Sequence, residues 1–260
     1  MKNRQPKVIL LVAGEGKRLR PYTLDRPKCM VEIDGFSLLG RQLEVLKAEG
    51  LDNIVMIGGY KANMLKKYGF RLKTNSRYYE TNMVWSLFSA EEELEGDIIV
   101  SYGDIVYSKE ILQSLLRSSA DIAVTIDKDW ENYWKLRNEN PLEDAETLKL
   151  CKDGAISEIG QKPKSLKEIE GQYMGLIKLS SKGVNLLKKL FHDSINRGNL
   201  RGKNVENSYM TDLLQAIIDS GQRIESVPIH GGWVEVDTVK DKYAKITLER
   251  LKKIKDSHEI

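Results

Sequence analysis

An apolar run followed by a glycine-containing basic loop dominates the start of the chain. Val8 to Ala13 are six consecutive apolar residues, too few to span a membrane and typical of a strand buried on both faces. Gly14 and Gly16 follow, and glycines let main-chain N–H groups converge on an anion because no side chain blocks the approach. The loop also carries Lys17, Arg18, Arg20, Arg26 and Lys28. These features predict a buried strand that leads into a polyphosphate-binding loop.

Two common glycine motifs are absent from this loop. The dinucleotide fingerprint needs a third glycine where Leu19 stands, and the Walker loop needs four residues between its glycines. The loop instead matches G-x-G-x-R-L-x-P-x-T-x-x-x-P-K at Gly14, Gly16, Arg18, Leu19, Pro21, Thr23, Pro27 and Lys28. This pattern resembles the opening of the sugar-1-phosphate nucleotidylyltransferase superfamily. An ordinary glycine turn beside a solvated basic run is the alternative, and eight matches at fixed spacing weigh against it.

Composition narrows the class of protein. With 260 residues and 41% hydrophobic content, we expect one domain over 1–260, with an acceptor-side excursion over 127–175. Lys+Arg 41 against Asp+Glu 38 gives a mixed surface, which implies no nucleic-acid partner. Cys29 and Cys151 show no disulfide or zinc spacing. No apolar run reaches a membrane span, so we expect a cytoplasmic protein without a membrane partner.

The order of apolar runs predicts the fold class. Strands are expected at Val8–Ala13, Ile54–Ile57, Asp97–Tyr102 and Ile122–Ile126, with amphipathic helices between them. This alternation predicts an α/β fold with a Rossmann-like, doubly wound and mostly parallel sheet. Ligands of such sheets bind beyond the carboxyl ends of the strands.

Two segments are candidates for further nucleotide contacts. Gly58 follows the second strand, where an ordinary strand-to-helix turn is equally compatible with the sequence. Asn82 and Ser86 belong to N-x-x-x-S-L, which is similar to the N-N-x-x-S-L stretch of bacterial phosphocholine cytidylyltransferases, with Met83 in place of the second Asn. We expect a helix from there to about Leu94, for which Asn82 could simply be the cap. The similarity favours CTP.

Two aspartates follow strands and are candidates for Mg²⁺, which prefers hard oxygen ligands. Asp104 comes after Asp97–Tyr102, and Asp237 lies in Gly232–Thr238, which resembles the W-x-D-I-D-T stretch of the superfamily. Glu235 replaces the first Asp, and strand alternation places it on the same side as Asp237. Either aspartate could instead cap a helix, Asp104 the one near Ser108 and Asp237 the one over Val239–Lys255.

The acceptor side is less regular. A hairpin delivers Gln161-Lys162-Pro163, which resembles the E-K-P motif of the superfamily, and Tyr173 lies in a strand over Gln172–Leu179. Glu206 ends a Gly- and Asn-rich loop that we expect to be mobile, where a solvated role is the alternative. Trp130, Tyr133 and Trp134 could box a substituted ammonium or cover a sheet edge.

The resemblance implies a role for each candidate. The backbone of Leu11, Ala13, Gly14, Glu15 and Gly16 would hold the nucleotide. Arg18 would bind its β- and γ-phosphates, and Lys28 its α-phosphate. Lys162 would hold the acceptor phosphate, and Tyr173, Glu206 and Glu235 would line the acceptor site.

The implied reaction joins CTP to a small phosphorylated or phosphonate metabolite, with Mg²⁺ as cofactor and a homodimer as the family's assembly. The residues leave several acceptors open: phosphocholine, an aminoalkyl phosphonate, phosphoglutamine or a sugar-1-phosphate. A sugar-1-phosphate nucleotidylyltransferase and a non-catalytic nucleotide sensor also remain open at this point.

Overall fold

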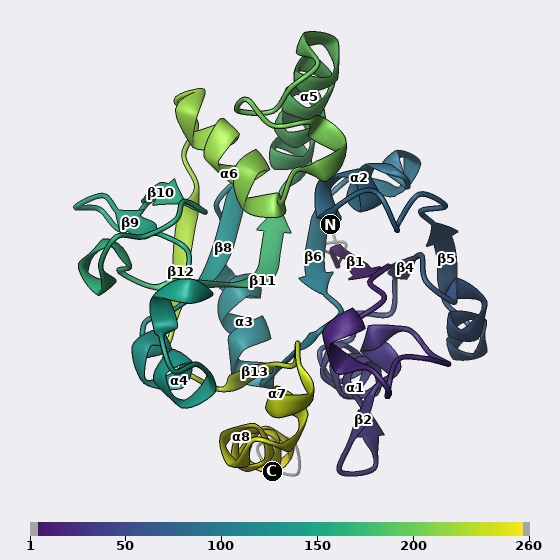
Figure 1. The fold of residues 1–260 in the computed structure, drawn as a ribbon. Coiled ribbons are helices and arrows are strands. Elements are labelled where there is room, and N and C mark those ends of the chain that lie inside the picture. Colours follow the sequence, from purple (N-terminus) through teal and green to yellow (C-terminus); the bar gives the residue numbers. More distant parts are fainter. Residues whose placement is uncertain (1–4, 257–260) are drawn as a thin grey trace.

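A seven-stranded sheet forms the centre of the computed structural model, which describes residues 5–256 (Figure 1). Its order is β12-β8-β11-β6-β1-β4-β5. Only β11 runs antiparallel to its neighbours within this sheet. The strands are β1 (Lys7–Val12), β4 (Ile54–Gly58), β5 (Arg71–Thr74), β6 (Ile98–Tyr102), β8 (Ile122–Asp127), β11 (Gln172–Leu179) and β12 (Glu225–Ile229). The predicted doubly wound, mostly parallel sheet is confirmed.

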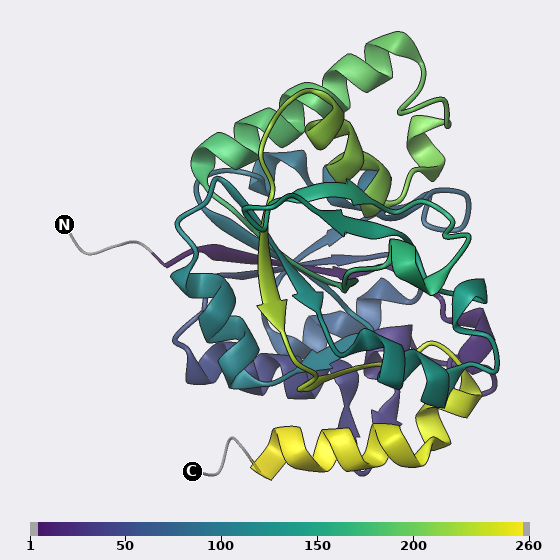
Figure 2. The same cartoon turned by 90° about the vertical axis from the view of Figure 1, so that its left-hand side faces the viewer.

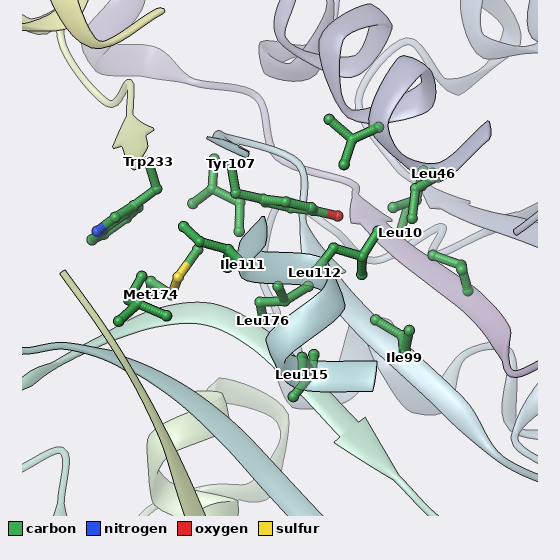
Figure 3. Packing of buried hydrophobic residues seen from close by; sticks show 14 of the residues in the cluster. Leu10, Leu46, Ile99, Tyr107, Ile111, Leu112, Leu115, Met174, Leu176 and Trp233 are labelled. Carbon is green, nitrogen blue, oxygen red and sulfur yellow. The ribbon is translucent and has the colours of Figure 1, made fainter. Parts of the chain in front are cut away.

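Helices cover both faces of the sheet, as Figure 2 shows. Because side chains alternate along a strand, Val8 and Leu10 face one side and Ile9 the other. The first face packs against α1 (Leu38–Ala48) and α3 (Lys109–Arg117), and Figure 3 shows Leu46 of α1 and Leu112 and Leu115 of α3 around it. The other face packs against α2 (Met83–Phe88), α5 (Ser181–Arg197) and α6 (Met210–Asp219). Burial on both sides explains the continuous apolar strand sequences.

Short strand pairs and further helices lie outside the central sheet. The strand pairs are β2 (Glu32–Ile33) with β3 (Phe36–Ser37), β7 (Ile105–Tyr107) with β13 (Trp233–Glu235), and β9 (Leu148–Leu150) with β10 (Ile156–Ile159). The remaining helices are α4 (Trp130–Arg137), α7 (Val239–Tyr243) and α8 (Lys245–Asp256). The 127–175 excursion therefore contains α4 and the β9–β10 hairpin. No helix in the described chain is both long and apolar enough to cross a membrane.

Three predicted elements differ from the structure. The helix expected to reach Leu94 ends at Phe88, and a separate 3-10 turn over Glu91–Glu93 follows. The helix expected over Val239–Lys255 is two helices, because Ala244 is extended between them. The amphipathic helix expected between the second strand and the next, near Ala62–Tyr68, is a 3-10 helix.

Candidate active site

The loops after β1, β4 and β6 are tied together at the carboxyl edge of the sheet. The Leu11 carbonyl accepts a hydrogen bond from the Gly103 N–H at 3.0 Å, and the Ala13 carbonyl accepts one from Tyr60 at 3.1 Å. A Cβ at Gly103 would lie 2.6 Å from Val12 Cγ1, so only glycine permits this approach. The first loop therefore has a fixed position beside Asp104.

Within the first loop, Gly16 and Lys28 form one packed unit. Gly16 has φ 66°, and a Cβ there would lie 3.0 Å from Lys28 Cβ. The Thr23 hydroxyl donates to the Gly16 carbonyl at 2.9 Å, and the Lys28 N–H donates to the Gly14 carbonyl at 3.3 Å. The loop folds back so that Lys28 lies beside it, while a Cβ at Gly14 would meet open space.

A lysine and three carboxylates meet at the end of this loop. Lys28 Nζ lies 2.6 Å from Asp104 Oδ2 and also pairs with Asp237 Oδ1. Arg18 Nη2 lies 2.9 Å from Asp237 Oδ2. One oxygen each of Asp104, Glu235 and Asp237 lie within 4.8 Å of one another. The fold thus brings Arg18 and Lys28 of the first loop together with Asp104, Glu235 and Asp237 from later parts of the sequence.

The charges of this cluster shift its pKa values in opposite directions. Burial alone would lower the pKa of Lys28, but the carboxylates of Asp104 and Asp237 raise it above its usual value. Burial would raise the pKa of Asp237, but the positive charges of Lys28 and Arg18 lower it below its usual value. Burial raises the pKa of Glu235 to about 7 against the opposing charge of Arg137. Lys28 and Asp237 therefore remain an ion pair near neutral pH.

The same carboxylates fit a divalent cation. They offer hard oxygen ligands, and Asp104 Oδ1 is buried without a hydrogen-bond partner in the described chain. Asp104, Asp237 and Glu235 are the residues that would hold such an ion. Because Lys28 already pairs with two of them, a bound cation and this position of the ammonium exclude each other.

Neither aspartate has the helix-capping role that the sequence left open. The side chain of Thr238 caps α7 by accepting from the Asp241 N–H at 3.1 Å, and the Asp237 side chain pairs with Lys28 and Arg18 instead. The residue before α3 is Ser108, and Asp104 makes no cap bond there. Both side chains are therefore available to the site.

Arg137 is the functional-site residue that sequence reasoning missed. Its side chain is 4% exposed and lies 2.7 Å from Glu235 Oε2 and 3.1 Å from Asp241 Oδ1. It compensates the charge of Glu235 and fixes the start of α7 next to Asp237. In the sequence, Arg137 is one arginine in a polar segment. Its two partners lie about a hundred residues later, so no local pattern predicts these ion pairs.

The aromatic residues of α4 do not form an open ammonium box. Trp130, Tyr133 and Trp134 are at most 3% exposed and pack around Trp233. The guanidinium of Arg137 lies over two of these rings, and that of Arg250 lies 3.8 Å from the centre of Tyr133. The cation–π positions are therefore filled by arginines of the chain itself.

The second predicted group of nucleotide residues has structural partners. Gly58 is buried, and a Cβ there would lie 2.9 Å from Ala62 Cβ, so it permits close packing of the turn after β4. Asn82 is the N-cap of α2 and accepts from the Met83 N–H at 2.9 Å. The Ser86 hydroxyl accepts from Asn75 at 3.0 Å. These contacts give the three residues structural roles that need no bound nucleotide. Their role in nucleotide binding stays a prediction.

Lys162 binds the backbone of a segment that lines a neighbouring cavity. Its Nζ donates to the carbonyls of Leu142 at 2.5 Å and Glu143 at 2.7 Å. The cavity, of 360 Å³, is lined by Glu143 together with Arg18 and Asp237. No described contact joins Lys162 to the carboxylate cluster, so its phosphate role also stays a prediction.

The remaining acceptor candidates lie apart from one another. Both Glu206 oxygens pair with the Arg77 guanidinium at 2.8 Å, which connects the turn before α6 to the loop before α2. Tyr173 packs edge-on against Tyr102, 5.7 Å between ring centres. The Glu15 side chain pairs with Arg20, and the predicted contact of its backbone with the nucleotide stays a prediction.

The arrangement can bind a polyphosphate and hold a second anion beside it. Arg18 and Lys28 supply positive charge next to the glycine loop, and the carboxylates can recruit a cation that screens phosphate repulsion. No histidine or serine base contacts the cluster in the described chain, and a phosphate nucleophile needs none because it is already ionised.

Known proteins with similar sequences and folds identify the family of this chain. The model of the MobA-like NTP transferase domain matches residues 8–174. The chain is 40% identical over 245 residues to a CTP:phosphoglutamine cytidylyltransferase of Campylobacter jejuni, covering 90% of this chain and 96% of that protein. It is 34% identical over 117 residues to a choline-phosphate cytidylyltransferase of Streptococcus pneumoniae, covering 44% of this chain and 51% of that protein. An inositol-1-phosphate CTP transferase from T. maritima has the same fold, with a TM-score of 0.74, 22% identity and 97% coverage of both chains.

Proposed function

The chain belongs to the family of MobA-like NTP transferase domains, and we propose that it is a cytidylyltransferase acting on a small phosphorylated, amine-bearing acceptor of the phosphoglutamine type. It is a nucleotidyltransferase, and the products of the proposed reaction are a CMP conjugate and pyrophosphate. The observation that carries the proposal is the cluster of Lys28, Asp104 and Asp237 beside the glycine loop. The 40% identity to the Campylobacter enzyme over nearly its whole length supports the choice of CTP and acceptor.

The chemistry needs positioning and charge compensation more than a proton relay. An oxygen of the acceptor phosphate attacks the α-phosphorus of CTP, the bond from that phosphorus to the bridging oxygen of pyrophosphate breaks, and pyrophosphate leaves with the electron pair. Arg18 binds the β- and γ-phosphates and Lys28 the α-phosphate in this scheme. Both leave their carboxylate partners for the nucleotide, which frees Asp104 and Asp237.

We propose Mg²⁺ as the divalent ion that these carboxylates hold, with Lys162 at the acceptor phosphate. The ion supplies charge screening between the two anionic substrates. Lys162 donates to the carbonyl of Glu143, which lines the cavity beside Asp237, and would reach the acceptor after leaving the carbonyls of Leu142 and Glu143. A cytoplasmic location fits the two cysteines, Cys29 buried and Cys151 exposed, which are both free.

Pyrophosphate release tests the proposal. The enzyme is incubated with Mg²⁺ and each of CTP, UTP, GTP, dTTP and ATP. Each nucleotide is paired with phosphoglutamine, phosphocholine, 2-aminoethylphosphonate or glucose-1-phosphate. We expect release with CTP and phosphoglutamine above all other pairs.

Other outcomes would replace this function. Release with UTP or dTTP and glucose-1-phosphate would identify a sugar-nucleotide enzyme. Tight CTP binding without release from any pair would identify a nucleotide-binding protein without turnover.

A further inference from the structure

One buried arginine contacts two different carboxylates next to the proposed cation site. Arg137 is the last residue of α4, and its side chain is 4% exposed. Its Nη1 lies 2.7 Å from Glu235 Oε2, and its Nε lies 3.1 Å from Asp241 Oδ1. Hydrogen bonds between a guanidinium and a carboxylate are strong and directional because both groups are charged. Two such bonds from one planar group fix the positions of Glu235 and Asp241 relative to each other.

Asp241 extends this connection to the backbone of Asp237. Its Oδ2 accepts hydrogen bonds from the Asp237 N–H at 3.1 Å, from the Thr238 N–H at 2.9 Å and from the Thr238 hydroxyl at 2.9 Å. The Asp241 side chain is 6% exposed, so water competes little for these bonds. Arg137 therefore holds Glu235 directly and the backbone of Asp237 through one intermediate carboxylate.

Aromatic rings of α4 fix the position of the Arg137 guanidinium. Its central carbon lies 5.2 Å from the ring centre of Tyr133 and 5.1 Å from that of Trp134. Both rings are at most 3% exposed. The Tyr133 hydroxyl also accepts a hydrogen bond from the Glu235 N–H at 3.1 Å. The same helix thus binds the backbone and the side chain of Glu235, which leaves this residue little freedom to move.

Glu235 differs in this respect from the other two carboxylates of the cluster. Asp104 and Asp237 pair with Lys28, which leaves them for the nucleotide in the proposed reaction. The partner of Glu235 is the buried Arg137, which has no such role. Glu235 Oε2 therefore stays occupied, and Oε1, which makes no hydrogen bond in the described chain, is the oxygen that can face an ion.

The number of oxygens that a carboxylate can offer matters for the choice of cation. Ca²⁺ takes six to eight oxygen ligands in flexible geometry and often binds both oxygens of one carboxylate. Mg²⁺ is smaller and requires an octahedron of single oxygens. A carboxylate with one oxygen held by a guanidinium can supply only a single ligand atom, which suits Mg²⁺ better than Ca²⁺.

We propose that Arg137 is a positioning residue that sets the cation specificity of the site: by holding Glu235 Oε2, it limits this carboxylate to one ligand oxygen and favours Mg²⁺ over Ca²⁺. The inference rests on the cation site of the proposed function and deepens it. Loss of the guanidinium would free the second oxygen of Glu235 and loosen the backbone of Asp237. Both changes suit a larger ion with a flexible ligand set.

The first test measures ion binding without turnover. It uses the Lys28→Met background, in which the ammonium that excludes a cation is absent. Melting temperatures at rising MgCl₂ or CaCl₂ and constant ionic strength give an apparent dissociation constant for each ion. Arg137→Lys is added to this background, because lysine keeps the charge but lacks the planar fork that reaches two carboxylates.

Arg250→Lys in the same background is the matched control. The Arg250 guanidinium lies 3.8 Å from the centre of the same Tyr133 ring, but it donates to the Trp233 carbonyl at 2.9 Å instead of a cluster carboxylate. Arg137→Lys should weaken Mg²⁺ binding by roughly 10- to 100-fold, as loss of a metal ligand's hydrogen-bond partner usually does. Ca²⁺ binding should change much less, and Arg250→Lys should keep the parent preference for Mg²⁺.

The second test uses Arg137→Lys in otherwise wild-type enzyme, which avoids the less stable double variant. Initial rates of cytidylyl transfer are measured at rising free Mg²⁺, with and without Ca²⁺. We expect a higher KM for Mg²⁺, a kcat at saturating Mg²⁺ close to that of wild type, and inhibition at a lower ratio of Ca²⁺ to Mg²⁺. A role in stability alone would leave both the KM for Mg²⁺ and the Ca²⁺ inhibition unchanged.

Three results of the melting titrations would overturn the inference. These are an unchanged preference for Mg²⁺ in Arg137→Lys, equal weakening of both ions, and no binding of either ion to the Lys28→Met parent. The titrations need neither acceptor nor turnover, so they decide the inference even if the proposed cytidylyl transfer fails. A lost preference for Mg²⁺ in Arg137→Lys would then still support the role of Arg137.

Discussion

The ammonium of Lys28 lies 2.6 Å from the carboxylate of Asp104, although 76 positions separate the two residues. The same ammonium pairs with Asp237, so one lysine joins the first loop to the ends of two further segments. Its side chain is only 12% exposed. In the absence of substrates, this lysine compensates the two carboxylates that a divalent cation would otherwise compensate.

Substitution of Lys28 should make the stability of the fold depend on a bound cation. In Lys28→Met, the two carboxylates lose their shared partner, and unfolding free energy should fall by about 3–5 kcal/mol, as for other broken buried pairs. Millimolar Mg²⁺ without CTP should restore part of the loss, because a ligand that binds only the folded state stabilises it. Thermal unfolding with and without Mg²⁺ measures both effects.

Lys17→Met is the control for Lys28→Met, because the Lys17 side chain is 69% exposed and its loss should leave the melting temperature unchanged. A Lys28→Met protein that is as stable as wild type and insensitive to Mg²⁺ would show that the carboxylates do not need compensation.

Arg137 should stabilise the fold through Glu235 and Asp241. Arg137→Met leaves both carboxylates without their buried partner and should cost about 3–5 kcal/mol in urea unfolding. Lys135→Met on the same helix removes an exposed pair with Glu131 and should change stability by less than about 0.5 kcal/mol. Glu235→Gln added to Arg137→Met should recover part of the loss. Additive effects of these two substitutions would argue against their direct coupling.

Two glycines of the site should respond differently to alanine. Gly103→Ala places a Cβ 2.6 Å from Val12 Cγ1 and 2.9 Å from the Leu11 carbonyl, so it should destabilise the fold by about 1–3 kcal/mol. A Cβ at Gly14 meets nothing within 4 Å, so Gly14→Ala should unfold at the wild-type temperature. Because the proposed triphosphate site approaches this backbone, Gly14→Ala should nevertheless raise KM for CTP about tenfold. Unchanged KM in a stable Gly14→Ala protein would exclude the loop from CTP binding.

Much of the fold followed from local pattern, because strands buried on both faces carry continuous apolar runs that few other elements share. Asp104 could also be recognised, because it follows a strand of the central sheet. Asp237 follows β13, which pairs with β7 outside that sheet, and only the resemblance of its segment to the W-x-D-I-D-T stretch pointed to it. The helix break at Ala244 could not be predicted from the sequence, because alanine has the highest helix propensity. Next to the break, Tyr243 packs against Tyr22 of the first loop, a contact between residues far apart in the sequence.

Residues whose role depends on distant partners were the hardest to predict. From the sequence alone, Arg137 would be interpreted as a solvated arginine. Only the fold shows that its helix lies next to Glu235. The α4 aromatics were compatible with a ligand box because the sequence does not show that Arg250 fills it.

Product analysis tests the central claim of cytidylyl transfer most directly. Wild-type enzyme and Asp104→Asn are incubated with Mg²⁺, phosphoglutamine and CTP labelled at the α-phosphorus. The products are then separated and identified by mass spectrometry. We expect wild type to move the label into a CMP–phosphoglutamine conjugate with one pyrophosphate per conjugate, and Asp104→Asn to do so at least about 100-fold more slowly. Label that remains in CTP, or that enters a conjugate equally fast in Asp104→Asn, would contradict it.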